Sequence, residues 1–160
     1  MKKFILPSIF LIALIVLSGF SSAPAPEKMK NFTLNDLSGN PVPLDSYNGK
    51  VVLLVFFATW CPPCQDEIPQ LEAIYRKYKA KNFEVIGINL RETGNSVKVF
   101  ANENKLSFTV LLDEKGDVGS LYKVKYIPKI FILDKNSEVK FTSHYLPAAE
   151  IEKEINKILR

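Results

Sequence analysis

The only two cysteines of this chain, Cys61 and Cys64, lie two prolines apart in the run FFATWCPPCQDEIP. The apolar run Val51–Phe57 precedes them and a segment with helical spacing of apolar residues follows, which predicts a strand-to-helix junction at the pair. Free backbone N–H groups and the positive dipole end at the start of a helix favour a thiolate, so we expect a lowered pKa for Cys61. Cys64, one helical turn later, is expected to be more buried and near enough to close a disulfide.

Three kinds of chemistry fit two cysteines at this spacing. In a redox pair, Cys61 attacks a substrate disulfide and Cys64 resolves the mixed disulfide. A closed zinc site needs four ligands, and the sole histidine, His144, supplies only a third. An inert staple is disfavoured, because a bridge across so few residues removes little chain entropy. The redox interpretation is therefore the preferred one, with no metal and no cofactor.

The elements that must position this pair alternate between strands and helices, which indicates an α/β sheet between helix layers. We expect strands at FTL, PVPL, Val51–Phe57, Phe83–Asn89, Thr109–Leu112, Lys129–Leu133 and Val139–Thr142. We expect helices at Cys61–Ala80, Ser96–Glu103, Val118–Tyr122 and Ala148–Leu159. Ser96 is the expected N-cap of its helix.

The N-terminus, MKKFILPSIFLIALIVLSGFSSAPAPEK, has two lysines before a long uncharged apolar run. Residues 1–23 are interpreted as a signal peptide or an N-terminal membrane anchor, residues 24–30 as a linker, and residues 31–160 as one domain. In either case the lysines stay on the cytoplasmic side and the domain is exported.

The overall charge does not indicate a polyanion partner. The formal net charge is +4, but removing residues 1–23 leaves 19 Lys and Arg against 17 Asp and Glu. Since no basic stripe with interleaved aromatics is visible, we expect no nucleic-acid partner.

The run GKVVLLVFFATWCPPCQDEIPQL, with the upstream FTLNDLSGNPVPLDSYNG and the downstream IPKIFILD, resembles TlpA/ResA-type exported thiol–disulfide oxidoreductases, a thioredoxin-like family. The resemblance covers Asn31 to Arg160. It implies a thioredoxin fold, a central mixed sheet flanked by helices, with an N-terminal β-hairpin and a central α/β insertion near Arg91–Val124. It also implies a location in the periplasm or at the outer face of the cytoplasmic membrane of a bacterium.

The same resemblance implies roles for individual residues. Cys61 would be the attacking thiol and Cys64 the resolving one, joined as a redox disulfide in the oxidised state. Trp60 would border the active site. Glu67, three residues after the second cysteine, matches the active-site glutamate of the family. A partly buried carboxylate with a raised pKa there could accept or supply the Cys64 proton.

A substrate-binding element is expected downstream. The Ile127-Pro128 bond matches the cis-proline of the family, which packs beside the cysteines and helps to present the neighbouring backbone to substrate. Two positions depart from related patterns. Val55 stands where ordinary thioredoxins carry a buried aspartate, which supports the exported branch. Lys129 follows the proline where many relatives carry a small polar residue, and we interpret it as a solvated strand residue.

The expected function is reduction of protein disulfides, with cytochrome c maturation as one candidate process. The acidic residue that follows the proline in some cytochrome c maturation reductases is absent, which weakens that assignment. The expected partners are protein disulfide substrates and a DsbD- or CcdA-like membrane thiol reductant, and the domain is expected to be a monomer. One alternative is a copper chaperone-like module using His144, although the cysteine spacing is one residue short for it. A peroxiredoxin-like peroxidase is the other, but Thr59 is out of register with both cysteines.

Overall fold

The computed structural model describes residues 27–160. The expected signal peptide or membrane anchor, residues 1–23, lies outside the described residues. Within residues 27–160, no helix is both long enough and apolar enough to cross a membrane.

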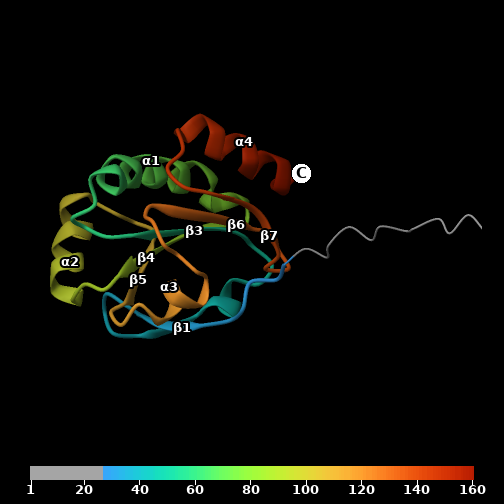
Figure 1. Ribbon diagram of the computed structural model, residues 1–160. Coiled ribbons are helices and arrows are strands. Elements are labelled where there is room, and N and C mark those ends of the chain that lie inside the picture. The colour runs from blue at the N-terminus through green and yellow to red at the C-terminus, as the bar shows by residue number, and fades with distance from the viewer. Residues whose placement is uncertain (1–26) are drawn as a thin grey trace, which may run out of the picture.

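A seven-stranded mixed sheet forms the centre of the fold, in the order β2-β1-β5-β4-β3-β6-β7 (Figure 1). β3 pairs in parallel with β4, which pairs in parallel with β5, and the remaining pairings are antiparallel. The strands are β1 Thr33–Asp36, β2 Pro41–Pro43, β3 Val51–Phe57, β4 Phe83–Leu90, β5 Thr109–Asp113, β6 Lys129–Leu133 and β7 Val139–Ser143.

Helices cover both faces of this sheet. In Figure 1, α1 and α4 lie together on one side, α3 and the N-terminal strand pair lie toward the other, and α2 lies at one end. The helices are α1 Pro62–Tyr78, α2 Gly94–Glu103, α3 Asp117–Leu121 and α4 Ala148–Leu159, with 3-10 turns at Leu44–Tyr47 and Lys79–Lys81. This arrangement confirms the expected α/β thioredoxin-type architecture, and α2, β5 and α3 occupy the range expected for the insertion.

The continuous apolar run of β3 belongs to a strand whose seven residues are all buried. Because side chains alternate across a strand, it feeds two cores. Leu53 and Val55 pack in the core under α1 and α4, whereas Leu54 and Phe56 pack on the opposite face, in the core that Met29 also joins. β3 is thus held firmly on both faces, which fixes the position of the cysteines that follow it.

Two boundaries differ from the sequence expectations. The prediction that α2 begins at Ser96 is wrong, because Thr93 has extended backbone angles and caps a helix that begins at Gly94. Residues 27–30 were expected to be part of a linker. Met29 is buried, however, and the backbone of Lys28 forms an isolated antiparallel β-bridge with Glu138, beside β7. These residues therefore contribute to the packed unit.

Candidate active site

The two cysteines form a disulfide at the amino-terminal end of α1, with their Cα atoms 5.3 Å apart. Cys61 is the N-cap residue of the helix and is 3% exposed, whereas Cys64 is 0% exposed. The pair therefore lies within bridging range, as the spacing predicts, and Cys61 is the sulfur nearer to solvent.

The first turn of α1 offers Cys61 few hydrogen-bond donors. Pro62 and Pro63 occupy the first two helical positions and have no N–H. The next two N–H groups, those of Cys64 and Gln65, both donate to the backbone oxygen of Cys61 at 3.0 Å. N-cap side chains normally accept from the second or third helical N–H. Stabilisation of a Cys61 thiolate therefore depends more on the helix dipole than on the free N–H groups that the sequence led us to expect.

The cis-proline loop closes over Cys61 from the other side. The Ile127-Pro128 bond is cis, and the backbone oxygen of Ile127 lies 3.8 Å from Cys61 Sγ. Pro128 is buried at the start of β6, and its own backbone oxygen lies 3.1 Å from Nδ1 of the exposed His144. The structure thus brings together Cys61 and Ile127, which the sequence assigned to one site.

Glu67 lies on α1 one turn after Cys64, and its side chain is fully buried. Positions three apart share one face of a helix, so the carboxylate and the Cys64 thiol face the same way. One carboxylate oxygen accepts a 3.0 Å hydrogen bond from the Leu146 N–H, and the other has no partner among the described residues. Burial raises the pKa of Glu67 to about 7, against the lowering effect of the Leu146 N–H. A carboxyl group in this state can release or accept a proton near neutral pH.

A network that sequence reasoning missed holds the loop between β3 and α1. The Glu92 carboxylate accepts hydrogen bonds from the Thr59 N–H at 2.7 Å, the Thr59 hydroxyl at 2.5 Å and the Asn89 side-chain amide at 2.6 Å. The Gln65 side chain donates to the Thr59 backbone oxygen at 2.6 Å. Thr59 is therefore anchored from both sides, two residues before Cys61. The sequence contains one indication of this network. The carboxyl ends of neighbouring parallel strands meet at one edge of the sheet, so polar residues after β3 and β4 can be expected to lie close together.

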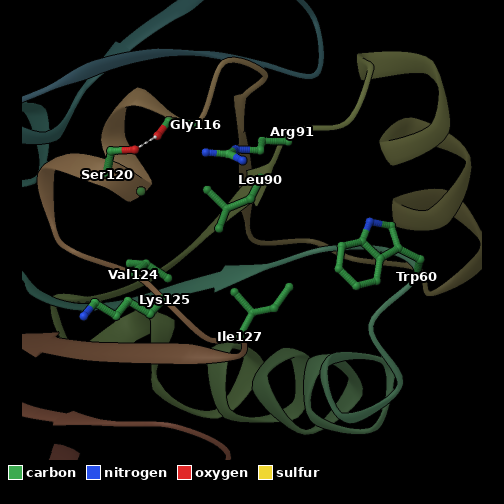
Figure 2. Close-up of a pocket in the computed structure, with 9 residues that line it drawn as sticks. Trp60, Leu90, Arg91, Gly116, Ser120, Val124, Lys125 and Ile127 are labelled. Atoms are coloured by element: carbon green, nitrogen blue, oxygen red, sulfur yellow. Dashed lines mark hydrogen bonds between the residues drawn. The ribbon is translucent and has the colours of Figure 1, made fainter.

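Trp60 follows this anchored threonine, and 69% of its surface is exposed. It borders a groove that also contains Ile127, as Figure 2 shows. An exposed indole beside a disulfide provides apolar contact area for a bound polypeptide. The role of Trp60 at the border of the active site stays a prediction.

Two further residues were singled out in the sequence, Val55 and Lys129. Val55 is a buried member of the core under α1. Lys129 is half-buried, with its Nζ 5.2 Å from the centre of the Phe131 ring, and burial lowers its pKa. Within residues 27–160, no group of three or more His, Cys, Asp and Glu side chains is arranged to hold a metal ion.

Comparison with known proteins places this geometry in a family. Residues 25–142 match the AhpC/TSA family. The chain is 39% identical over 110 residues to the thiol-disulfide oxidoreductase ResA of Geobacillus kaustophilus (69% of this chain, 63% of the relative). It is 38% identical over 109 residues to the ResA of Bacillus thuringiensis, covering 68% of this chain and 63% of the relative. The chain thus spans less than two thirds of the length of these curated relatives.

A solved structure of another thiol-disulfide protein shares the fold. A crystal structure of a Chlorobium tepidum protein, assigned provisionally as the thiol:disulfide interchange protein DsbE, superimposes with a TM-score of 0.80 at 34% identity. The match covers 87% of this chain and 100% of that one. The chain therefore belongs to the AhpC/TSA thioredoxin-like family, and its resemblance to ResA-type proteins is confirmed.

Proposed function

We propose that this protein is a thiol–disulfide oxidoreductase that reduces disulfides in other proteins. The observation that carries the proposal is the Cys61–Cys64 disulfide at the start of α1, with Ile127 against one sulfur. The names of the ResA relatives support the same chemistry.

The reaction begins with the reduced pair. The Cys61 thiolate attacks one sulfur of a substrate disulfide, forming a mixed disulfide and expelling the first substrate thiolate, which takes up a proton. Glu67 then accepts the proton of Cys64, and the Cys64 thiolate attacks the Cys61 sulfur. This step forms the Cys61–Cys64 disulfide and releases the second substrate thiolate. Two electrons have passed from the protein to the substrate.

Turnover needs a reductant to restore the dithiol. We propose a membrane thiol reductant of the DsbD or CcdA type, because exported proteins work in an oxidising compartment. The export assignment depends on residues 1–23, whose composition is that of a signal peptide or an anchor. Cytochrome c maturation is a candidate process on this proposal. Fractionation of cells that make the full chain, with mass determination of the mature protein, tests export and cleavage together.

Insulin reduction tests the proposed activity. The wild type with dithiothreitol is expected to accelerate insulin precipitation, and Cys61→Ser is expected to fall to the rate of dithiothreitol alone. Cys64→Ser retains the attacking thiol, so it should accumulate a mixed disulfide that mass spectrometry detects. Equal background rates for the wild type and Cys61→Ser would contradict the proposal.

Two control assays separate the alternatives. A peroxidase would consume hydrogen peroxide far faster than a free thiol does. A copper chaperone would bind Cu(I) tightly in the reduced state and lose that binding in His144→Ala. We expect neither result. The hydroxyl of Thr59, the threonine nearest the cysteines, is hydrogen-bonded to Glu92, which argues against the peroxidase. His144 Nδ1 lies against the Pro128 backbone oxygen, which argues against the copper site.

A further inference from the structure

A groove of about 330 Å³ runs from the disulfide end of the sheet toward α3. Its middle is apolar and its far part carries two cations; the residues that define it are Trp60, Leu90, Arg91, Val124, Lys125 and Ile127. In Figure 2 the guanidinium of Arg91 points toward Gly116 and Ser120, and Trp60 lies on the other side of Leu90. The groove therefore has an aromatic end near the cysteines and a cationic end away from them.

The groove lies beside the redox site. Trp60 is the neighbour of Cys61 in the chain, and the backbone oxygen of Ile127 lies 3.8 Å from Cys61 Sγ. A polypeptide that presents a sulfur to Cys61 has these two residues on its path. Residues next to its reactive cysteine can therefore enter the groove.

The charge of the groove has one sign. No Asp or Glu lines it, and within residues 27–160 neither Arg91 nor Lys125 forms an ion pair. Four carboxylates lie close by in the sequence or behind the wall. Glu114 and Asp117 line a separate pocket. Asp113 and Glu92 have hydrogen-bond partners. Asp113, 2% exposed, accepts the Gly119 N–H at 2.7 Å, and Glu92 accepts the bonds from Thr59.

The Arg91 side chain is exposed and lies close to Gly116. It lies across Gly116, where an added Cβ would come within 2.5 Å of Arg91 Nε. Gly116 also has a φ of +76°, which favours glycine. The missing side chain leaves room for the Arg91 side chain at this end of the groove.

We propose that this groove is a specificity subsite for substrate segments that carry an aliphatic residue beside the reactive cysteine and carboxylates beyond it. The aliphatic side chain packs against Leu90, Ile127 and Trp60, and the carboxylates pair with Arg91 and Lys125. This subsite gives the proposed reductase a preference for acidic protein segments, so the inference rests on the proposed function.

The position of the only tryptophan of the chain gives a direct test, because Trp60 fluorescence reports occupancy of the groove. The probes are acetylated, amidated peptides without cysteine, Gly-Ser-Leu-Glu-Glu and its reverse Glu-Glu-Leu-Ser-Gly, with Gln replacing Glu in the matched pair. They are titrated into the oxidised full chain. We expect one Glu peptide to bind about fivefold tighter than its Gln counterpart at low salt, the size expected from exposed ion pairs. High salt should remove the difference.

Two variants locate the effect. Arg91→Gln combined with Lys125→Gln should abolish the preference for Glu over Gln. Lys123→Gln removes an exposed cation outside the groove and should leave the preference intact. Equal binding of Glu and Gln peptides in both chain directions overturns the subsite, as does an equal loss in Lys123→Gln.

This titration involves no sulfur exchange, so its outcome is separate from that of the insulin assay. A protein that reduces insulin but binds the Glu and Gln peptides equally keeps the proposed function and loses the subsite. A protein that prefers the Glu peptides but fails to reduce insulin keeps the acidic-segment site and loses the reductase assignment.

Discussion

Two glutamates on α1, Glu67 and Glu72, have the same side chain and similar burial but opposite surroundings. Glu67 is 0% exposed and Glu72 is 6% exposed. Glu67 receives one hydrogen bond, from the Leu146 N–H, and one of its oxygens has no partner among the described residues. The two carboxylates thus separate the effect of burial from the effect of hydrogen bonding.

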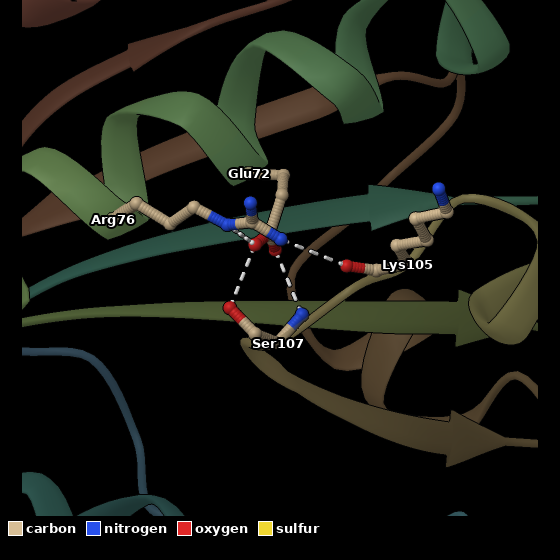
Figure 3. Close-up of polar contacts among 4 residues, drawn as sticks. All are labelled: Glu72, Arg76, Lys105 and Ser107. Carbon is tan, nitrogen blue, oxygen red and sulfur yellow. Dashed lines mark hydrogen bonds and ion pairs between the residues drawn. The ribbon is translucent and has the colours of Figure 1, made fainter.

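Both carboxylate oxygens of Glu72 accept hydrogen bonds, as Figure 3 shows. It accepts the Ser107 N–H at 2.8 Å, the Ser107 hydroxyl at 2.6 Å and the Arg76 Nε at 2.5 Å. Arg76 also donates to the Lys105 backbone oxygen at 3.3 Å. Burial alone would raise the pKa of Glu72, but the bonds from Ser107 and the charge of Arg76 outweigh it, and the pKa is lowered.

The surroundings of the two carboxylates indicate a structural role for Glu72 and support the proposed proton transfer by Glu67. Glu72 ties α1 to the segment before β5 as a permanent anion. Within residues 27–160 Glu67 forms no ion pair, and burial disfavours its charged form and raises its pKa to about 7. The proposed mechanism moves a proton at this carboxyl group. Buried groups left short of partners are candidates for function for this reason.

The largest expected effect of this contrast is on stability against pH. The pKa of Glu67 is raised from 4.5 to about 7 on folding, so its contribution is fully favourable below about pH 4.5 and is lost as pH rises through 7. The shift corresponds to about 3 kcal/mol. We expect urea unfolding of the oxidised protein to show this decline in the difference between the wild type and Glu67→Gln, which removes the titration. A difference that does not change between about pH 5 and about pH 8 would show that Glu67 ionises normally.

The next effect is on catalysis. Glu67→Gln keeps the shape and removes the titrating group, so the second step of insulin reduction should slow by about 100-fold near pH 7. Rapid-mixing measurements of mixed-disulfide decay follow this step. Asp66→Asn changes an exposed neighbouring carboxylate on the same helix and serves as the control. Equal decay rates for the wild type and Glu67→Gln would remove Glu67 from the mechanism.

Glu72 should behave in the opposite way. Glu72→Gln leaves the donors of Ser107 and Arg76 facing a buried amide in place of a carboxylate, so we expect a loss of about 2 kcal/mol in the free energy of unfolding. The rate of insulin reduction per folded molecule should stay unchanged. Arg76→Gln, which removes only the exposed partner, should cost at most about 1 kcal/mol. A catalytic defect in Glu72→Gln without a stability defect would reverse the assignment of the two glutamates.

Local patterns predicted the elements and the reactive pair. The continuous apolar run of β3 and the helical spacing in α1 and α4 match the structure within one or two residues, because burial imposes those periods on a sequence. The start of α2 was missed, since both Thr93 and Ser96 are good N-caps and only the path of the chain selects between them.

Contacts between distant segments could not be predicted in the same way. Glu67 accepts a hydrogen bond from the N–H of Leu146, in the loop before α4. The N–H of Thr59 donates to Glu92, which follows β4. The Arg91 side chain lies close to Gly116. Each contact depends on which strands are neighbours and on loop geometry, neither of which has a periodic signature. The motif resemblance supplied Glu67 and Pro128 as candidates, but it gave no indication of the Glu92 network.

The smallest predicted effect extends the comparison from carboxylates to sulfur. The first turn of α1 is poor in donors because Pro62 and Pro63 lack N–H groups, whereas Glu72 accepts hydrogen bonds from Ser107 and Arg76. Pro63→Ala restores the second helical N–H, which can donate to the Cys61 thiolate. A gain of about 1 kcal/mol for the reduced form would raise the redox potential of the pair by about 20 mV and lower the Cys61 pKa.

Pro62→Ala is the control. It relaxes the same turn but adds its N–H at the first position, out of reach of the N-cap side chain, so the redox potential of this variant should move less. Glutathione equilibration of the three proteins measures the potentials, and equal shifts in both variants would assign the effect to relaxed backbone rather than to a new donor.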